Sequence, residues 1–553
     1  MAGEEGKVQE GLKEFFEHPL LRPRTLWYRR YQEEIMGEAV RRNTMVILPT
    51  ALGKTVISIL VAVQLLHRYR KGKVLVMAPT RPLVVQHARN FVSSVRLLPS
   101  EPRVLTGRVD PGRRERAWRE GRVFFATPEV VRNDLEEGRL GLGEFVLLVF
   151  DECHRAVKEY AYTLVAQRYL QECPYPLVLG LTASPGSSPE RIEAICRALG
   201  IEHVEYRTEL DEDVSPYVHP VEVTWQKVPL PPEYSSLSSL LREMAGEKVR
   251  WLWEHGYLRV PPSRVTRKIL LGVGEELRRR LAAAREKGPL FTALRCQSLS
   301  LTLSHALELL ESQGPSALRS FLERVEGKSG ERRTYSLLLR DPRYARLKEL
   351  LASLPEHPKM ERLLAEVRTQ LESSRESRVL VFAQYRDTAS RLVEHLSRGL
   401  PGVRVERFVG QSSRARDLGL KQREQLEVLD RFRRGETRVL VGTSIAEEGL
   451  DIPSVDLVVF YEPVPSEIRY IQRKGRTGRF SFGRVVILLS ESRFDLASHF
   501  SSRRKVKRMQ SLVREVERRL QPILRLSVPT PDPMTEEELS DPLRDAPFQV
   551  EEG

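Results

Sequence analysis

The sequence predicts an α/β protein in which two doubly wound, parallel-sheet domains flank a helical insert. Three observations predict this fold class. Short apolar runs alternate with amphipathic stretches in the two outer regions, apolar residues at helical spacing fill the middle, and the chain is 553 residues long. Continuous apolar runs are typical of strands buried on both faces of a parallel sheet. A chain of this length exceeds what one hydrophobic core usually supports, so several domains are expected.

The first region carries five apolar runs separated by stretches with the spacing of helices. These runs are Met45–Leu48, Val74–Ala78, Val123–Ala126, Val146–Phe150 and Leu177–Leu181. Strands that alternate with helices pair in parallel and carry helices on both faces of the sheet. We therefore expect a first α/β domain over residues 1–216.

The middle region changes to the apolar spacing of helices, as in the set Leu237, Leu240, Leu241 and Met244. We expect a helical, thumb-like insert over residues 217–355. Its basic residues include Arg264, Arg267, Lys268, Arg278, Arg279 and Arg280. These side chains either face phosphates or are simply solvated, and the sequence leaves both readings open.

Apolar runs of the strand type return in the last third of the chain. They are Val379–Ala383, Val439–Val441, Leu457–Phe460 and Val485–Leu489, and they predict a second α/β domain over residues 356–520. A basic segment after Arg503 predicts a helix. The remaining residues, 521–553, are acidic and rich in proline, and we expect them to be disordered because they lack core-forming side chains.

Composition narrows the possible partners and compartments. A net charge of +14 suggests a polyanionic partner, because lysine and arginine release counterions from phosphates, although a basic surface that is merely solvated fits equally well. No apolar run reaches the roughly 20 residues of a membrane span and no leader opens the chain, so we expect a cytoplasmic protein. The four cysteines lie far apart, which indicates neither a zinc site nor a disulfide framework.

A phosphate-binding loop is predicted where the first apolar run meets a helical stretch. Gly53, Lys54 and Thr55 stand at this junction, and backbone amides at a helix N-terminus bind phosphates. We expect Lys54 to reach the β- and γ-phosphates of ATP and the Thr55 hydroxyl to bind Mg²⁺. The loop itself would be Pro49, Thr50, Ala51, Leu52 and Gly53. Leu48 and Ala51 stand where many such loops have glycine.

Two adjacent acids follow the fourth apolar run. Asp151 and Glu152 would lie at the carboxyl edge of the sheet, where ligands bind in open α/β folds. We expect Asp151 to hold Mg²⁺ through water, and Glu152 to position and deprotonate the attacking water. The alternative is a strand-capping turn with solvated acids.

A second half of the site is predicted in the second domain. Arg476 and Arg479 are three residues apart and could complete the nucleotide site across a gap between domains. Such a split site can use ATP hydrolysis to open and close the gap.

In this setting, the run from Asp151 to His154 resembles the acidic motif of the superfamily 2 helicases, whose other motifs follow in order. The resemblance implies RecA-like domains, ATP and Mg²⁺ as cofactors, and Gln32 as the adenine-reading glutamine. It also implies Asp451 near the ribose and Gln472, Arg476 and Arg479 as the arginine-finger motif. His154 is expected to link motifs rather than to perform chemistry.

The same resemblance implies contacts to one nucleic-acid strand through its backbone. The residues are Pro79, Thr80, Arg81, Thr106, Gly107, Thr127, Pro128 and Thr443. The segment from Leu181 to Ser184 is similar to the motif that couples hydrolysis to strand binding.

Segments outside these shared motifs are similar to the archaeal Hef helicases and the Fanconi anaemia group M translocases. They are Phe408–Gln411, Gly419–Glu424, Val459–Ser466 and His357–Met360. The closer resemblance implies a 3′→5′ DNA helicase or translocase in repair or fork restart, acting on replication forks and four-way junctions. Hef proteins commonly add a nuclease domain, and Glu331 to Arg333 only partly match its signature. Any nuclease is therefore expected in trans, as is a sliding clamp.

Three other functions stay open at this point. One is an RNA-dependent ATPase of the Dicer or innate-sensor type. Another is a DEAD-box RNA unwinder, against which the insert and Cys153 argue. The third is an ATP-gated scaffold that recruits a nuclease without turnover.

Overall fold

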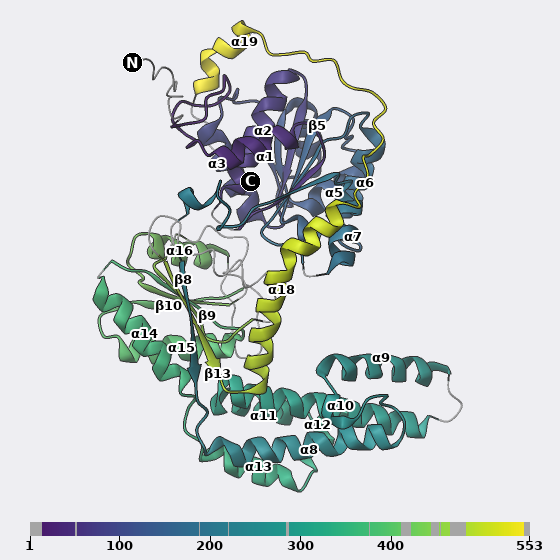
Figure 1. Ribbon diagram of the computed structural model, residues 1–553, viewed down its shortest axis with the longest axis vertical. Coiled ribbons are helices and arrows are strands. Elements are labelled where there is room, and N and C mark those ends of the chain that lie inside the picture. Colours follow the sequence, from purple (N-terminus) through teal and green to yellow (C-terminus); the bar gives the residue numbers. More distant parts are fainter. Residues whose placement is uncertain are drawn as a thin grey trace, which may run out of the picture.

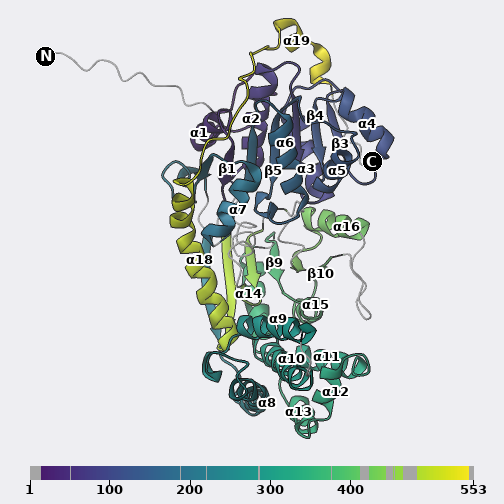
Figure 2. The same cartoon turned by 90° about the vertical axis from the view of Figure 1, so that its right-hand side faces the viewer.

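The protein consists of two parallel-sheet domains, a helical insert, and a C-terminal segment that runs past all three (Figure 1). The structure is a computed structural model. It describes residues 14–49, 52–186, 188–218, 221–283, 287–374, 376–410, 422–443, 453, 455–464 and 483–546. The second domain lies between the first domain and the insert in both views (Figure 2).

The first domain is a parallel sheet in the order β3-β4-β2-β5-β6-β1-β7. Its strands are β1 (Thr44–Ile47), β2 (Lys73–Met77), β3 (Pro102–Leu105), β4 (Val123–Ala126), β5 (Phe145–Asp151), β6 (Val178–Thr182) and β7 (His203–Tyr206). Its helices are α1 (Arg30–Ala39), α2 (Lys54–Arg68), α3 (Arg81–Ser94), α4 (Pro111–Glu120), α5 (Pro128–Glu136), α6 (Ala161–Glu172) and α7 (Pro189–Leu199). Two buried clusters of apolar side chains lie on the opposite faces of the sheet, as a doubly wound fold requires.

The second sheet has the order β10-β11-β9-β12-β13-β8 and is also parallel. Its strands are β8 (Val221–Val228), β9 (Val379–Phe382), β10 (Val405–Phe408), β11 (Val439–Gly442), β12 (Leu457–Phe460) and β13 (Gly483–Ser490). The flanking helices α14 (Lys359–Ser373), α15 (Arg386–Gly399) and α16 (Gln422–Arg433) belong to this domain.

The expected start of the insert at residue 217 is wrong, because β8 belongs to the second sheet. It pairs in parallel with β13 along its whole length, from Val221 opposite Gly483 to Val228 opposite Ser490. Helices fill the region only after this strand. They are α8 (Tyr234–Glu254), α9 (Arg267–Ala283), α10 (Gly288–Glu308), α11 (Pro315–Gly327), α12 (Arg333–Leu339) and α13 (Arg343–Ala352). A π-helical turn, Leu309–Gln313, follows α10.

The predicted basic helix is α18 (Arg493–Glu517), and it connects all three modules. Near its start, Asp495 contacts the insert and the second domain through Ser312 and Lys359. Near its end, Met509, Val513 and Val516 are buried in a core cluster of the first domain. The helix therefore spans from the base of the insert to the first sheet.

The expectation of a disordered tail is wrong for residues 521–546, which lie along the first domain. Met534 packs in the first domain's core, and the short helix α19 (Glu536–Ser540) follows it. Asp532 pairs with Arg70 at 3.3 Å, and Arg544 pairs with Glu101 at 3.1 Å. The tail is poor in apolar residues, but its charged side chains pair with opposite charges on the first domain.

None of the helices that the structure describes combines the length and the apolar character needed to cross a membrane.

Candidate nucleotide and nucleic-acid site

At the carboxyl edge of the seven-stranded first sheet, the six strands other than β7 form two halves, β3-β4-β2 and β5-β6-β1. The phosphate-binding loop follows β1, and Asp151 and Glu152 stand at the end of β5. The coupling segment Leu181–Ser184 lies between them at the end of β6, and the predicted strand-contacting residues of this domain follow β3, β4 and β2. The boundary between the halves lies between β2 and β5, which pair directly. The fold therefore brings both sets of predicted residues to one edge, as expected for an open α/β sheet.

The phosphate-binding loop ends at Gly53, which caps α2 in the left-handed conformation at φ 76°. A Cβ atom here would also collide with the side-chain amide nitrogen of Gln32. Glycine is therefore required for the backbone angle, and it leaves room for the Gln32 amide. The Lys54 ammonium donates to the carbonyl oxygens of Leu48 at 3.0 Å and Pro49 at 3.3 Å, so it lies folded back over the loop that it is expected to serve.

Gln32 is buried against the phosphate-binding loop and fits the role of a nucleotide contact. Its Nε2 donates to the carbonyl oxygen of Leu52 at 3.2 Å, and the neighbouring Tyr31 hydroxyl donates to the same oxygen at 2.7 Å. Its Oε1 is buried and accepts no hydrogen bond from any residue that the structure describes. A buried acceptor without a donor is costly, and the amino group of adenine would supply one.

Asp151 ends β5 with its carboxylate buried in the site. Burial acts to raise the pKa of this carboxyl, but the hydrogen bond from His87 and the positive charge of Lys54 outweigh burial and hold the pKa below its ordinary value. The group is thus an anion at neutral pH, which suits a divalent cation with oxygen ligands. Thr55, in the first turn of α2, adds a hydroxyl, so the residues present fit Mg²⁺.

Glu152 adopts a left-handed backbone, φ 50° and ψ 47°, which is uncommon for a residue other than glycine. Such strain persists at sites where the surrounding structure imposes it. The side chain lies 3.2 Å from Nδ1 of His154, which also contacts the Thr182 hydroxyl at 3.0 Å. Thr182 in turn donates to the carbonyl oxygen of Ser184. His154 therefore joins the acidic motif to the segment after β6, the linking role expected for it.

The predicted strand-contacting residues lie where β2, β3 and β4 end. Pro79, Thr80 and Arg81 lead into α3, and Thr127 and Pro128 begin α5. Helix N-termini offer free amides and a positive dipole end to phosphates. Thr106 and Gly107 lie in the loop after β3, where the Thr106 side chain is buried and Gly107 is exposed.

A buried ion-pair network that the sequence did not indicate fixes this loop. Arg114 donates two hydrogen bonds to Asp134, at 2.8 and 2.7 Å, and a third to the carbonyl oxygen of Val109 at 2.6 Å. The indole of Trp118 donates to the same carboxylate at 2.9 Å. Burial opposes ionisation of Asp134, but Arg114 and Trp118 hold its pKa below the ordinary value. No motif in the sequence pointed to these residues.

The second half of the predicted nucleotide site lies outside the described residues. This applies to Asp451, Gln472, Arg476 and Arg479, and also to Thr50 and Ala51 of the phosphate-binding loop. Thr443 is described. It follows β11 and is buried, and its amide donates to the carbonyl oxygen of Phe408 at 3.2 Å.

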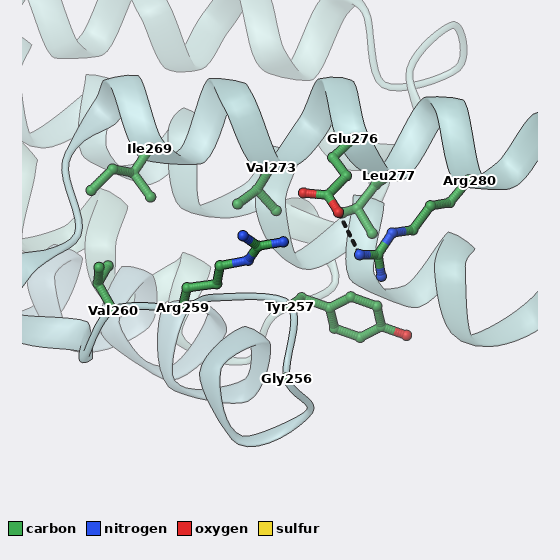
Figure 3. A pocket seen from close by; sticks show the side chains of 9 residues that line it. All are labelled: Gly256, Tyr257, Arg259, Val260, Ile269, Val273, Glu276, Leu277 and Arg280. Atoms are coloured by element: carbon green, nitrogen blue, oxygen red, sulfur yellow. Dashed lines mark hydrogen bonds and ion pairs between the residues drawn. The ribbon is translucent and has the colours of Figure 1, made fainter.

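The insert exposes the predicted basic residues on and beside α9. Arg264, Lys268, Arg278 and Arg279 are exposed and form no ion pair with any residue that the structure describes, whereas Arg267 lies 3.4 Å from Glu308. A cavity of about 160 Å³ opens between α9 and the loop before it (Figure 3). Its lining is Gly256, Tyr257, Arg259, Val260, Ile269, Val273, Glu276, Leu277 and Arg280.

Trp251 is packed within the insert rather than presented to solvent. Its ring stacks on His255 with centroids 4.0 Å apart and lies nearly parallel to Tyr257. Trp253 is about half exposed, at 46%.

Three protein families match the chain in succession. The DEAD/DEAH box helicase family matches residues 29–192, the helical bundle of a putative ATP-dependent RNA helicase matches residues 233–355, and the helicase conserved C-terminal domain matches residues 358–481. These ranges correspond to the first domain, the insert and the second domain of the fold.

Individual relatives carry names that differ in the nucleic acid they mention. A putative ATP-dependent RNA helicase of Methanocaldococcus jannaschii is 39% identical over 91% of this chain and 63% of its own length. The DEAD-box ATP-dependent DNA helicase Fancm of Drosophila melanogaster is 33% identical over 86% of this chain and 34% of its own. The chain thus spans about one third to two thirds of the length of these relatives.

The helicase domain of Pyrococcus furiosus Hef has the same fold. Its crystal structure superposes with a TM-score of 0.65 at 43% sequence identity, covering 86% of this chain and 98% of the Hef domain. The order of the matched families, the fold and this identity agree with one another. The chain therefore belongs to the superfamily 2 helicases, in the family of the Hef helicase domain, Fancm and the ATP-dependent DNA helicase Mph1 of Neurospora crassa, which is 33% identical over 84% of this chain and 41% of its own length.

Proposed function

We propose that the protein is an ATP-dependent DNA helicase or translocase that moves 3′→5′ and acts on branched DNA such as forks and four-way junctions. The observation that carries this proposal is the shared sheet edge, where the nucleotide residues and the strand-contacting residues follow neighbouring strands. A movement of the nucleotide residues can therefore shift the strand-contacting residues, and the reverse, through a few side chains. The names of the Fancm and Mph1 relatives, both DNA helicases, support DNA as the substrate.

In the proposed cycle each residue of the first domain has one task. Lys54 leaves the loop carbonyls to hold the β- and γ-phosphates of ATP, and Gln32 accepts from adenine. Thr55 and Asp151 would hold Mg²⁺, which neutralises phosphate charge. Glu152 orients a water and accepts its proton, and its constrained backbone fixes the carboxylate for this purpose.

The second domain would complete the site when the gap closes. Arg476 and Arg479 would stabilise charge on the transferred phosphoryl group, with Gln472 as part of the same motif, and Asp451 would contact the ribose. After hydrolysis, release of the phosphate removes the anionic partner of the arginines, and the domains separate. Because both domains hold the strand by its backbone, with Thr443 in the second, closing and opening advance the protein without reading base sequence.

The insert is the proposed sensor of a second duplex arm. Backbone contacts from two motor domains track a strand but do not distinguish a junction from linear DNA. On the insert, Arg278 and Arg279 are exposed and free of ion pairs with described residues, and Arg259 points from its loop toward α9 (Figure 3). Exposed arginines that are not held in ion pairs bind the phosphates of a nucleic acid whatever its base sequence.

An RNA-dependent ATPase is the second candidate. The helical-bundle family and the Methanocaldococcus relative both carry RNA helicase in their names. An RNA-dependent enzyme would rely on the ribose 2′-hydroxyl, whereas a DNA enzyme would not.

Turnover with different nucleic acids tests the proposal. ATP hydrolysis should be measured with fork DNA, linear duplex DNA and RNA at one fixed salt concentration, beside Lys54→Ala as the inactive control. We expect fork DNA to stimulate most and RNA least. Stimulation by RNA above that by DNA would favour the second candidate, and absence of turnover with every nucleic acid would favour a scaffold without catalysis.

Deletion of residues 217–355 is a poor test of the insert, because it would remove β8 and expose the buried Lys359. A charge substitution is cleaner. The double variant Arg278→Ala with Arg279→Ala should keep DNA-stimulated hydrolysis but lose preference for fork over linear duplex in competition. Arg346→Ala, exposed on α13 and paired only with Glu349 at 2.8 Å among the described residues, is the matched control. Unchanged fork preference in the double variant would assign branch sensing to the motor domains.

A further inference from the structure

The two halves of the sheet edge are joined by a hydrogen bond between side chains. His87 lies on α3, the helix that begins with the strand-contacting residue Arg81. Its Nε2 lies 2.9 Å from Oδ2 of Asp151, at the end of β5 in the nucleotide half. Because an ionised carboxylate only accepts, Nε2–H donates. The bond thus crosses the boundary between β2 and β5.

Both partners are shielded from water, with side-chain exposures of 7% for His87 and 10% for Asp151. Water can therefore replace neither partner when one moves. A carboxylate is held in one orientation when one of its oxygens accepts a hydrogen bond from a fixed donor. Its other oxygen is then directed toward the metal ion that it would bind. Partners of this kind set the geometry of metal-binding carboxylates.

Helix α3 is a rigid connection between the nucleic acid and this carboxylate. Residues near its N-terminus are the proposed contacts to the strand, and His87 lies almost two turns further along the same helix. A shift of α3 on strand binding would carry His87 with it. Its imidazole would then move the Asp151 carboxylate within the nucleotide site.

We propose that His87 is a positioning residue through which strand binding at the start of α3 sets the orientation of Asp151. The inference rests on the proposed function, in which Asp151 holds Mg²⁺ and α3 contacts the strand. It assigns His87 a part in stimulation of ATP hydrolysis by DNA. Without that part, His87 would be an ordinary buried side chain of the first domain.

Three variants separate coupling from stability. His87→Leu removes the donor, and His87→Gln keeps an amide N–H near the position of Nε2. Phe91→Leu is the control, because Phe91 is buried on the same helix, in the core cluster, and makes no hydrogen bond to Asp151. All three substitutions disturb α3, but only His87→Leu removes the hydrogen bond to Asp151.

Two measurements are needed, and one does not depend on turnover. The first is the stimulation of ATP hydrolysis by single-stranded DNA. The second is the ratio of DNA dissociation constants with and without a non-hydrolysable ATP analogue and Mg²⁺, measured by fluorescence anisotropy. This ratio reports the coupling between the sites, which is reciprocal.

We expect His87→Leu to reduce stimulation by about 10-fold or more and to bring the ratio of dissociation constants toward one. His87→Gln should retain most of both, and Phe91→Leu should match the wild type. Full coupling in His87→Leu overturns the inference, as does an equal loss in Phe91→Leu. The other two variants test the inference if His87→Leu does not fold. Loss of coupling in Phe91→Leu, with coupling retained in His87→Gln, then also overturns the inference, because any disturbance of α3 would be enough to break the coupling. A wild type that hydrolyses no ATP would instead refute the proposed function itself.

Discussion

The ammonium group of Lys359 lies 2.5 Å from Oδ2 of Asp495, and the two side chains are 0% and 5% exposed. The Ser312 hydroxyl of the insert donates to the other oxygen of Asp495 at 2.6 Å. The amide and hydroxyl of Ser490, at the end of β13, donate to Oδ2. One carboxylate therefore holds together the insert, α14, the second sheet and the start of α18.

Removing the cation from this junction should strongly destabilise the second domain. Lys359→Met leaves the Asp495 charge buried without its cation, which costs about 3–5 kcal/mol. The measurement is urea unfolding followed by a probe in the second domain. Arg398→Ala on α15 breaks an exposed pair with Glu394 and should change the free energy of unfolding by less than about 1 kcal/mol. Equal effects of the two substitutions would contradict the role of the junction.

The same junction should weaken in acid because of His357. Burial, and then the positive charge of Lys359, lower the pKa of His357 from 6.5 to about 3. Its Nδ1 accepts from the amide of Lys359, so the folded state resists protonation. The unfolded state binds a proton as pH falls below 6.5, and the free energy of unfolding then falls by about 1.4 kcal/mol per pH unit until the pH nears 3.

The comparison of His357→Gln with the wild type isolates this effect. Between pH 7 and pH 5, the wild type should lose about 2 kcal/mol more stability than the variant, because other titrating groups contribute equally to both. Urea unfolding at the two pH values gives this difference. A pH dependence that is the same in both proteins would show that His357 is not held neutral.

The docked tail should be released by a single substitution. Arg544 is 4% exposed and joins Glu101 of the first domain to the carbonyl oxygen of Glu538 in α19. Arg544→Ala should speed proteolytic cleavage within residues 521–546. Leu524→Ala, at an 86% exposed position of the same segment, should not. Rapid cleavage of this segment in the wild type would contradict the docking.

The arginines of the second domain should act in catalysis rather than in binding. Arg476→Ala or Arg479→Ala should reduce kcat by about 10³-fold or more, the scale seen when an arginine is withdrawn from phosphoryl transfer. The affinity for ATP should change far less, because closure stabilises the transition state more than the ground state. Affinity and kcat that fall by the same factor would exclude the finger role for that residue.

The sequence predicted the interior of both sheets but not their edges. Apolar runs marked every described interior strand, from β1, β2, β4, β5 and β6 to β9, β11, β12 and β13. The four edge strands, β3, β7, β8 and β10, were missed. An edge strand has one hydrogen-bonded neighbour and partly exposed faces, so its sequence need not be a continuous apolar run. Val405–Phe408, with Glu406 and Arg407 inside it, is an example.

The candidate site divides in a similar way. Motifs with fixed spacing identified Lys54, Asp151 and Glu152, because the residues of each motif are adjacent in the sequence. His87 and the Arg114–Asp134 pair gave no signal, since their partners are 64 and 20 residues away and only the fold brings them together. The prediction of a disordered tail was wrong because composition does not show which charged residues of the first domain pair with those of the tail.

In the proposed function, ATP hydrolysis at this edge drives movement along one DNA strand. Displacement of a labelled strand from forks that carry a single-stranded arm of only one polarity tests it most directly, with Glu152→Gln as the variant that binds ATP without cleaving it. We expect displacement by the wild type from forks with a 3′ arm, little from forks with a 5′ arm, and none by Glu152→Gln. Equal displacement by Glu152→Gln and the wild type would show that hydrolysis at this site does not drive the movement.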